Sequence, residues 1–482
     1  MMIRPMKNIF KLLTIGGALL IGSCTDLETE PRQSLTPESA LSSVDGYESL
    51  GLTAYGTLRD FNRYGQQLVI APEIMADNLR IIANTGRYIG QEVNADRSHM
   101  GIWNGGYWTG INTTNIVLAG IDEVEGDDTQ RAQVKGEALF LRAMLYFDGA
   151  RIYGYEPGKE VNGWDRSMII RTEPTLGFSN ADFRERSSNR EVYDLIISDL
   201  QAAIGLLPTS SLGTSGVYRA SRGAAQALLA RVYLYDSKYA EAEAAATAAM
   251  ASFGITDAGT GLMDAANYVA GFSTFPNPES LFEIEIRSND WSGVDGVNNS
   301  VCSLSSNLFP SAQFIVSATD ELLEAYEEGD VRVDTWTETT RSGADGNVYR
   351  SEKWAGAKGD FLENLPVIRA SELFLIRAEA RAETGNGTGA RADLDALRAK
   401  RGLGAVDAEL SGAALIGQIM NERRVEFALE GHRWFDMKRK GMDITKRATL
   451  ETLPYSDYRI LAPLPIDEIQ LNELLVDNPG YN

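Results

Sequence analysis

Two stretches of the chain match each other in their pattern of small and apolar residues. The matching positions are Ala230, Tyr233, Ala242, Ala246 and Ala249 in residues 222–250, and Ala378, Arg381, Ala390, Leu394 and Leu397 in residues 373–403. Small residues at these offsets allow two antiparallel helices to approach closely, while the larger ones fill the groove between them. The match therefore predicts a helix–turn–helix unit that occurs at least twice.

This unit resembles the tetratricopeptide repeat (TPR), whose period is about 34 residues. Gly385, Gly387 and Gly389 are expected in the turn between the two helices of the second stretch. A phosphate-binding interpretation of GNGTG at 385–389 is disfavoured, because the motif follows a helix and no Lys-Ser or Lys-Thr pair closes it.

Helical periodicity marks four further segments, at residues 46–58, 103–121, 131–153 and 191–207. The third carries a wide apolar stripe, as expected of a buried helix, at Ala138, Leu141, Leu145 and Phe147. Most of the chain is therefore predicted to be helical.

Residues 270–365 differ from the rest of the chain. SLFEIEIR at 280–287 alternates apolar and charged residues, which predicts a strand. Residues 319–329 predict a short amphipathic helix, and the remainder is polar loop with isolated tryptophans. The predicted fold is mainly α: a TPR-like helical-repeat scaffold with a loop-rich insertion that contains short β-strands.

The first residues predict export. Three basic residues precede or open an apolar run at 12–21, which is too short to span a bilayer and fits the core of a secretory signal. Small residues then end at Cys24, and Met6 is an alternative start. This arrangement resembles a bacterial lipobox, which implies cleavage before Cys24 and lipidation of its thiol. The alternative is an incidental cysteine after an ordinary cleavage site.

Charge and cysteine content exclude several classes of protein. The net charge of −22 disfavours binding to nucleic acid or to anionic headgroups. The chain has two histidines, which leaves little room for His-based metal sites. If Cys24 carries lipid, Cys302 stands alone and no intramolecular disulfide forms. Cys302 is expected to be a small buried side chain.

The sequence holds no nucleotide-binding, zinc-protease or nucleophile-elbow motif. Glu422, Glu426 and Glu430 follow one another at helical spacing beside arginines, which allows an acid/base site to be imagined. We favour a helix over 421–439 whose ion pairs and Trp434 pack against neighbouring helices. No catalytic residue is predicted, and a structural Ca²⁺ is left open.

The chain resembles the SusD/RagB family of outer-membrane lipoproteins over essentially its whole length. Seven stretches carry the resemblance in the correct order: CTDLETEP at 24–31, WNGGYWTGINTTN at 103–115, GEALFLRAMLYFDGARIYG at 136–154, AAQALLARVYLY at 224–235, LPVIRASELFLIRAEA at 365–380, ERRVEFALEGHRWFDMKR at 422–439 and LAPLPIDEIQLNELLVDNPGY at 461–481.

The resemblance implies four TPR-like units decorated by loops. It implies a surface lipoprotein, anchored to the outer membrane by lipid on Cys24, that captures a glycan and passes it to a SusC-like TonB-dependent transporter. Some members of the family are tied to peptides instead. The expected organisation is a signal peptide at 1–23, an N-terminal helical region at 24–260 and a C-terminal region at 261–482. In the last, the insertion covers about 270–365 and helices cover about 366–440, before a tail.

A glycan site needs an exposed aromatic plane with amides, carboxylates or arginines beside it, because sugars present C–H faces edged by hydroxyls. The candidates are Trp291, Asn289 and Asp290, with Trp354, in the insertion, and Asp77, Asn78, Arg80, Tyr88 and Trp103 nearer the N-terminus. Trp103 is compatible with either the core or the surface, whereas Tyr107 is assigned to the core. No binding residue follows from the resemblance, since ligand loops vary most between members.

Four functions remain open from the sequence. The first is glycan capture for a transporter, and the second is capture of peptides or another polymer by the same scaffold. The third, a secreted glycosidase, is disfavoured because no acid/base pair is placed. The fourth, a scaffold for protein assembly, is disfavoured by the lipid anchor and the Trp-bearing loops.

Overall fold

Four helical hairpins follow one another along the chain and pack side by side. The computed structural model describes residues 40–103, 106–177, 179–209, 213–290, 293–446 and 451–481. Successive members of the series contact each other in the order α2 (Val44–Leu58), α5 (Tyr107–Gly120), α6 (Asp128–Tyr153), α7 (Asn189–Leu206), α8 (Arg222–Tyr235), α9 (Tyr239–Ser252), α14 (Ala370–Glu383) and α15 (Gly387–Ala399). The chain divides into two units, Met1–Ser42 and Ser43–Asn482, and all these helices belong to the second. The predicted mainly α repeat scaffold is confirmed.

The two stretches that match in sequence form the last two hairpins. All the alanines and leucines at the matched positions are buried in the helix contacts, and α9 packs directly on α14. Gly385 lies in the turn with φ +87°. Gly387 and Gly389 instead open α15, which corrects their assignment to the turn. The amide of Gly389 donates to the Asn386 side chain at 3.0 Å, a close approach that a Cβ would obstruct.

The described strands form antiparallel pairs, and the insertion supplies at least one strand to three of them. The pairs are β1 (Leu79–Ile81) with β3 (Val316–Ala318), β2 (Ser280–Ile284) with β6 (Leu365–Arg369), β4 (Trp336–Thr339) with β5 (Val348–Ser351) and β7 (Ile444–Thr445) with β8 (Thr452–Leu453). The predicted strand is confirmed at β2, although its glutamate is buried: Glu283 accepts hydrogen bonds from Ser280, Asn277 and Asn364. The helix expected over 319–329 is shorter, at α13 (Asp320–Leu323).

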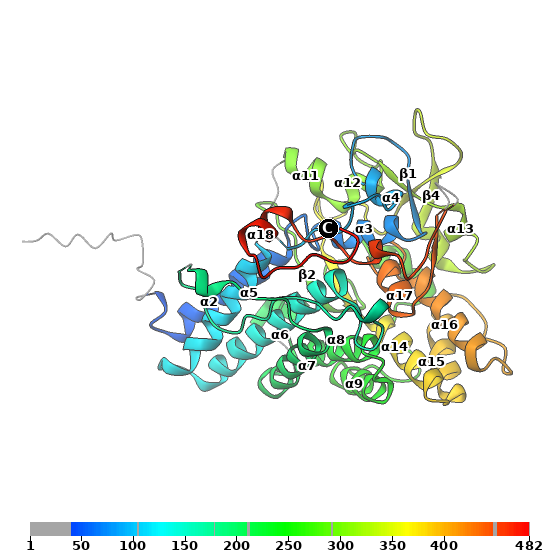
Figure 1. The fold of residues 1–482 in the computed structure, drawn as a ribbon. Coiled ribbons are helices and arrows are strands. Elements are labelled where there is room, and N and C mark those ends of the chain that lie inside the picture. Colours follow the sequence, from blue (N-terminus) through cyan, green and yellow to red (C-terminus); the bar gives the residue numbers. More distant parts are fainter. Residues whose placement is uncertain are drawn as a thin grey trace, which may run out of the picture. The chain divides into compact units, whose positions relative to one another are not determined.

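Further helices complete the described part of the unit: α3 (Gln67–Met75), α4 (Ile89–Glu92), α10 (Tyr268–Gly271), α11 (Gly293–Asn299), α12 (Val301–Ser305), α16 (Gly412–Glu426), α17 (Arg433–Arg439) and α18 (Ile466–Leu471). In Figure 1 the hairpins α6–α9 and α14–α15 lie along one side of this unit, and α11–α13 with β1 and β4 lie on the other. No helix within the described ranges combines the length and the apolar character needed to cross a membrane.

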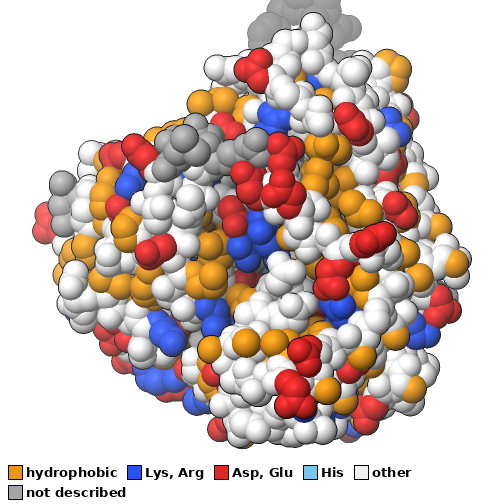
Figure 2. Space-filling view, turned by 90° about the vertical axis from the view of Figure 1, so that its right-hand side faces the viewer, with side chains coloured by type: hydrophobic (Ala, Val, Ile, Leu, Met, Phe, Trp, Pro, Cys, Tyr) orange, Lys and Arg blue, Asp and Glu red, His pale blue; other side chains and the backbone are white. Residues whose placement is uncertain are grey.

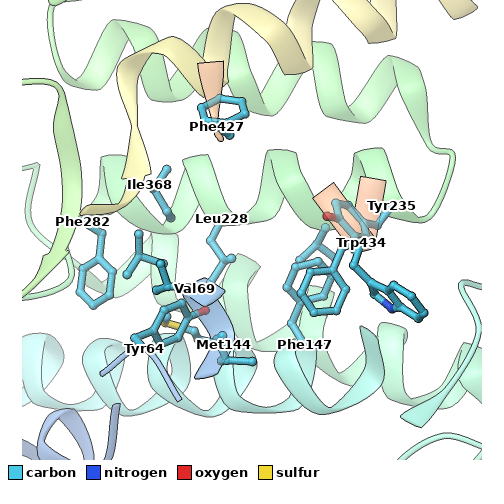
Figure 3. Packing of buried hydrophobic residues seen from close by; sticks show 14 of the residues in the cluster. Tyr64, Val69, Met144, Phe147, Leu228, Tyr235, Phe282, Ile368, Phe427 and Trp434 are labelled. Atoms are coloured by element: carbon cyan, nitrogen blue, oxygen red, sulfur yellow. The ribbon is translucent and has the colours of Figure 1, made fainter. Parts of the chain in front are cut away.

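The core joins the hairpins to the insertion. Figure 3 shows Phe147 of α6 beside Tyr235 of α8, and their rings meet edge-on with centroids 5.2 Å apart. Phe282 of β2 and Ile368 of β6 approach the same layer from the insertion, and both are buried. Apolar burial of this kind stabilises by about 25 cal/mol per Å². The strand pair β2–β6 thereby fixes the insertion to the scaffold.

The charged segment 421–439 is two helices, not one. α16 ends at Glu426, and the chain reverses through Leu429 and Gly431, both with positive φ, before α17 begins. A Cβ on Gly431 would lie 1.9 Å from the carbonyl oxygen of Leu68, so the close approach of α3 requires glycine there. This contact is tertiary, which is why helical spacing alone did not reveal the break.

The ion pairs of this segment are buried rather than exposed. Glu426 accepts hydrogen bonds from Arg369 at 3.0 Å and from Arg401 at 2.9 Å, and Glu279 bridges the same two arginines. Burial raises the pKa of Glu426, but the two guanidinium groups outweigh it and hold the pKa well below its ordinary value. Glu426 is thus held in ion pairs with arginines of neighbouring elements, the packing that the sequence favoured for this segment.

Candidate functional site

The indole of Trp354 lies in the core and is 2% exposed. Its Nε1 donates a 2.8 Å hydrogen bond to the carbonyl oxygen of Leu429, in the break between α16 and α17. Its ring meets Phe272 edge-on at 6.3 Å. A ring without an exposed face cannot stack on a ligand, so the structure corrects the expectation that Trp354 offers a binding platform.

Trp103 is also a core residue, at 1% exposed. Its ring packs edge-on against Trp108 and Tyr153, at 5.3 and 5.2 Å between centroids. Tyr107 is buried and donates a 3.0 Å hydrogen bond to the carbonyl oxygen of Leu145, which confirms its assignment to the core. The sequence allowed either the core or the surface for Trp103, and the structure places it in the core.

Asp77 and Asn78 hold the end of α3 to α16 and α17. Asp77 receives two hydrogen bonds from Arg433, at 2.6 and 2.8 Å. Burial raises the pKa of Asp77, and the bonds from Arg433 outweigh it and leave the pKa lowered. Asn78 is fully buried, donates to Glu73 at 2.7 Å and accepts from Arg424 at 2.8 Å. The structure thus places Asn78 out of a ligand's reach.

A pocket of about 320 Å³ opens beside Asp77 and Arg80. Arg80 donates to the carbonyl oxygens of Asp345 and Asn347. Lys446 donates to three carbonyl oxygens at the end of α3, and burial lowers its pKa to about 7. Figure 2 views the side that carries α13 and α16, where Lys and Arg side chains gather in a hollow among Asp and Glu. The charged groups named here are engaged within the protein.

Tyr88 belongs to a different cluster, which spans the turn before α4 and the insertion. Its hydroxyl donates a 2.9 Å hydrogen bond to the Gln66 side chain, whose amide donates to the carbonyl oxygen of Asn298 at 2.8 Å. Arg87 donates to the same carbonyl oxygen, and Gln313 donates to the Asn298 side chain at 2.6 Å. We call these five residues the amide cluster. Apart from Gln66 they are half-buried, so polar groups remain at the surface.

Asp290 fixes the adjoining loop to the scaffold. One of its carboxylate oxygens accepts from Arg59 at 3.1 Å, and the other accepts from the backbone amide of Arg287 at 2.7 Å. Asn289 is exposed beside it. Trp291 lies outside the described residues, and its predicted role remains a prediction. The loop leads into α11, which carries Asn298 of the amide cluster.

Phe61 is an exposed aromatic residue that the sequence reasoning missed. It lies in the turn from α2 to α3, between Arg59 and Gln66, both of which bond to the loop and α11 segment. Its side chain is 42% exposed. The sequence signal for an exposed ring was an aromatic residue between two polar residues, Asp60 and Asn62, in a turn without helical or strand periodicity. We define the candidate site as the amide cluster, the loop of Asn289 and Asp290, and Phe61 in the turn between Arg59 and Gln66, the two residues that bond to this region.

This arrangement suits a neutral, hydroxyl-rich ligand. An aromatic face packs against C–H groups, while amides, a phenol and a guanidinium offer both donors and acceptors at the edges. Asp290 has both oxygens engaged, which does not suit an acid or base in catalysis. Within the described ranges, no group of three or more His, Cys, Asp or Glu side chains is placed to hold a metal ion.

Two family models match the chain. Residues 61–234 match a model described as starch-binding associating with outer membrane, and residues 349–481 match the model of the SusD family. A SusD-like protein of Formosa agariphila is 25% identical, with 98% of this chain and 99% of that protein covered. A SusD-like protein of Bacteroides ovatus is 22% identical, with 89% and 82% covered.

Solved structures share the fold. A SusD superfamily protein of Bacteroides vulgatus superposes with a TM-score of 0.79 at 24% identity, covering 91% of this chain and 99% of that one. A laminarin-binding SusD-like protein superposes with a TM-score of 0.71 at 24% identity, covering 91% and 100%. At these identities the likeness establishes the architecture.

Proposed function

This chain belongs to the SusD/RagB family, and from that premise we propose that it is a non-catalytic surface lipoprotein that captures a glycan. The observation that carries the proposal is the candidate site, where the turn that carries an exposed phenylalanine also holds the residues that bond to the amide cluster and to the loop of Asp290. Sugars need this combination of an apolar plane with flanking donors and acceptors. The laminarin-binding relative adds support, since it has the same fold.

We further propose delivery to a SusC-like TonB-dependent transporter in the outer membrane. The acidic composition disfavours direct adhesion to anionic lipid, so attachment rests on the expected lipid at Cys24. Capture on a tethered protein raises the local concentration of a polymer at the transporter mouth. Isolation of the membrane complex through a tag on this chain tests the partnership: a TonB-dependent barrel should co-purify, and a Cys24→Ala variant should leave the membrane fraction.

Affinity electrophoresis of the full chain in detergent, against laminarin, starch, xylan, pectin, levan and mannan, tests glycan capture. Retardation by one glycan class without release of reducing sugar is the expected result. Release of reducing sugar would instead make the chain a glycosidase. Binding to a peptide mixture with no retardation by any glycan would move the function to the capture of peptides by the same scaffold.

A further inference from the structure

A groove of about 680 Å³ lies between α2 and the strand β2, outside the amide cluster. This volume falls within the range of about 300–1,000 Å³ that is usual for ligand sites. One wall is the face of α2 formed by Ser49, Thr53 and Gly56, which recur at helical spacing. Gly56 has no atom within 4 Å of the position that a Cβ would take, so the wall is open above it.

Tyr55 and Phe282 back the groove from the core, where both rings are buried, and the rim of the groove is polar. At the rim, Tyr218 accepts a 3.0 Å hydrogen bond from Asn364 and remains half-exposed. Arg287 pairs with Glu285 at 2.9 Å and is more than half exposed. The donors and acceptors of this rim can bind hydroxyl groups, as those of the candidate site can.

Charge in the groove is balanced rather than of one sign. Arg219 pairs with Glu48 and Glu137 at 2.5 and 2.9 Å, and Arg59 pairs with Asp290. An anionic ligand would have to compete with these carboxylates, whereas hydroxyl groups can bond to both members of an ion pair. The groove therefore favours a neutral polyhydroxylated chain.

Arg59 connects the groove to the candidate site. It lines the groove and at the same time holds Asp290, the residue that precedes Trp291 and the loop into α11. Phe61 follows two positions later in the chain. A ligand that lies over Phe61 and Asp290 can thus continue past Arg59 along the face of α2.

We propose that the α2 groove, lined by Thr53, Tyr55, Gly56, Arg59, Tyr218 and Arg287, is a second subsite that binds further sugar units of the same neutral glycan chain. The proposal rests on the proposed function. It adds that the protein selects extended chains over short oligosaccharides, because a short one fills the candidate site alone.

Calorimetry of the full chain with an oligosaccharide series tests the groove. The probes are disaccharides to heptasaccharides prepared from each of the six polysaccharides named above. Wild type should bind the longest probe of one series about tenfold more tightly than the trisaccharide, as expected when a second contact region is filled. Gly56→Trp places an indole in the groove and should remove this gain while leaving trisaccharide affinity unchanged.

Gly51→Trp is the matched control. Gly51 also lies in α2 with no atom within 4 Å of its Cβ position, but it lies on the opposite face of the helix and does not line the groove. Thr53→Trp is a second blocking variant, since Thr53 is exposed on the groove wall. Thermal unfolding of all three should match wild type.

Two failures are distinguishable. If wild type binds an oligosaccharide series but its affinity does not rise with length, or if Gly56→Trp and Thr53→Trp both retain the rise, the groove is not a subsite and glycan capture stands. If wild type binds none of the probes while the peptide mixture is bound, glycan capture itself fails, and the groove proposal fails with it. If Gly51→Trp also loses the gain in affinity with oligosaccharide length, the loss comes from a change in α2 as a whole, and the subsite proposal is overturned.

Discussion

Arg59 and Asp290 form a 3.1 Å ion pair that joins the end of α2 to the loop before α11, across 231 positions of sequence. Arg59 lines the α2 groove, and Asp290 lies in the loop before α11, which carries Asn298 of the amide cluster, so the pair joins both proposed contact regions. Both side chains are only partly exposed. The pair thereby ties a loop of the insertion to the turn that carries Phe61.

Arg59→Ala should weaken glycan binding about tenfold, because the loop that carries Asn289 and Asp290 loses its anchor. The free energy of unfolding should fall by no more than about 1 kcal/mol, as for other partly exposed ion pairs. Calorimetry and urea unfolding measure the two quantities. Arg350→Ala is the control, because Arg350 pairs with Glu352 at 2.8 Å with similar exposure elsewhere in the insertion. Equal loss of affinity in both variants would show that the effect is not local.

Phe61→Ala should reduce affinity for the bound glycan about tenfold through loss of the stacking plane. Stability should be almost unchanged, since the ring is exposed in the folded protein. Met442→Ala, at 38% exposure in the turn after α17, removes a comparable exposed side chain and should bind normally. Undiminished affinity in Phe61→Ala would remove Phe61 from the site.

Glu363 should make stability depend on pH. Burial raises its pKa to about 8, compared with about 4.3 in an unfolded chain. Between these values the folded chain holds a proton that the unfolded chain has lost, so the free energy of unfolding falls as pH rises towards 8. Urea unfolding should show that the free energy of unfolding of wild type, relative to that of Glu363→Gln, falls by about 2–4 kcal/mol between about pH 5 and 8.

Glu352→Gln controls for the pH series, because Glu352 is paired at the surface. Its stability difference from wild type should stay flat over the same range. A wild-type profile parallel to that of Glu363→Gln would mean that the buried carboxyl does not retain its proton.

Glu426→Gln should destabilise the fold by about 3–5 kcal/mol, because it removes one of the two carboxylates that bridge the buried guanidinium groups of Arg369 and Arg401. Asp122→Asn, which removes an exposed pair with Lys135, should cost less than about 1 kcal/mol. Urea unfolding distinguishes the two. Similar losses in both would contradict a structural role for the buried network.

The scaffold could be predicted from the sequence because its signals are local and repeated. Ala230, Ala242, Ala378 and Ala390 mark helix contacts through size and spacing, and all four are buried there. For Glu283 the local pattern predicts the strand but not the burial of the side chain. Alternation predicted its strand correctly, but its burial depends on partners such as Asn364, which lies 81 positions away.

The candidate site was harder to predict than the scaffold. Trp354 and Trp103 carry the residue type that sugar sites favour, yet tertiary contacts bury both rings. Tyr88 and Asp290 were predicted singly, and only the structure shows that they bond to the same turn, through Gln66 and Arg59. Phe61 lies in a turn, where no periodicity distinguishes an exposed aromatic residue from a buried one. Exposure is a property of the packed molecule, which is why residue type alone misassigned these rings.

Hydrogen exchange of the full chain, with and without the glycan that retards it, tests the central claim most directly. The account predicts slower amide exchange at residues 59–66, 86–90 and 287–299, with the hairpin of α14 and α15 unchanged. Protection confined to other segments while these three exchange as before would contradict the assignment of glycan capture to this surface.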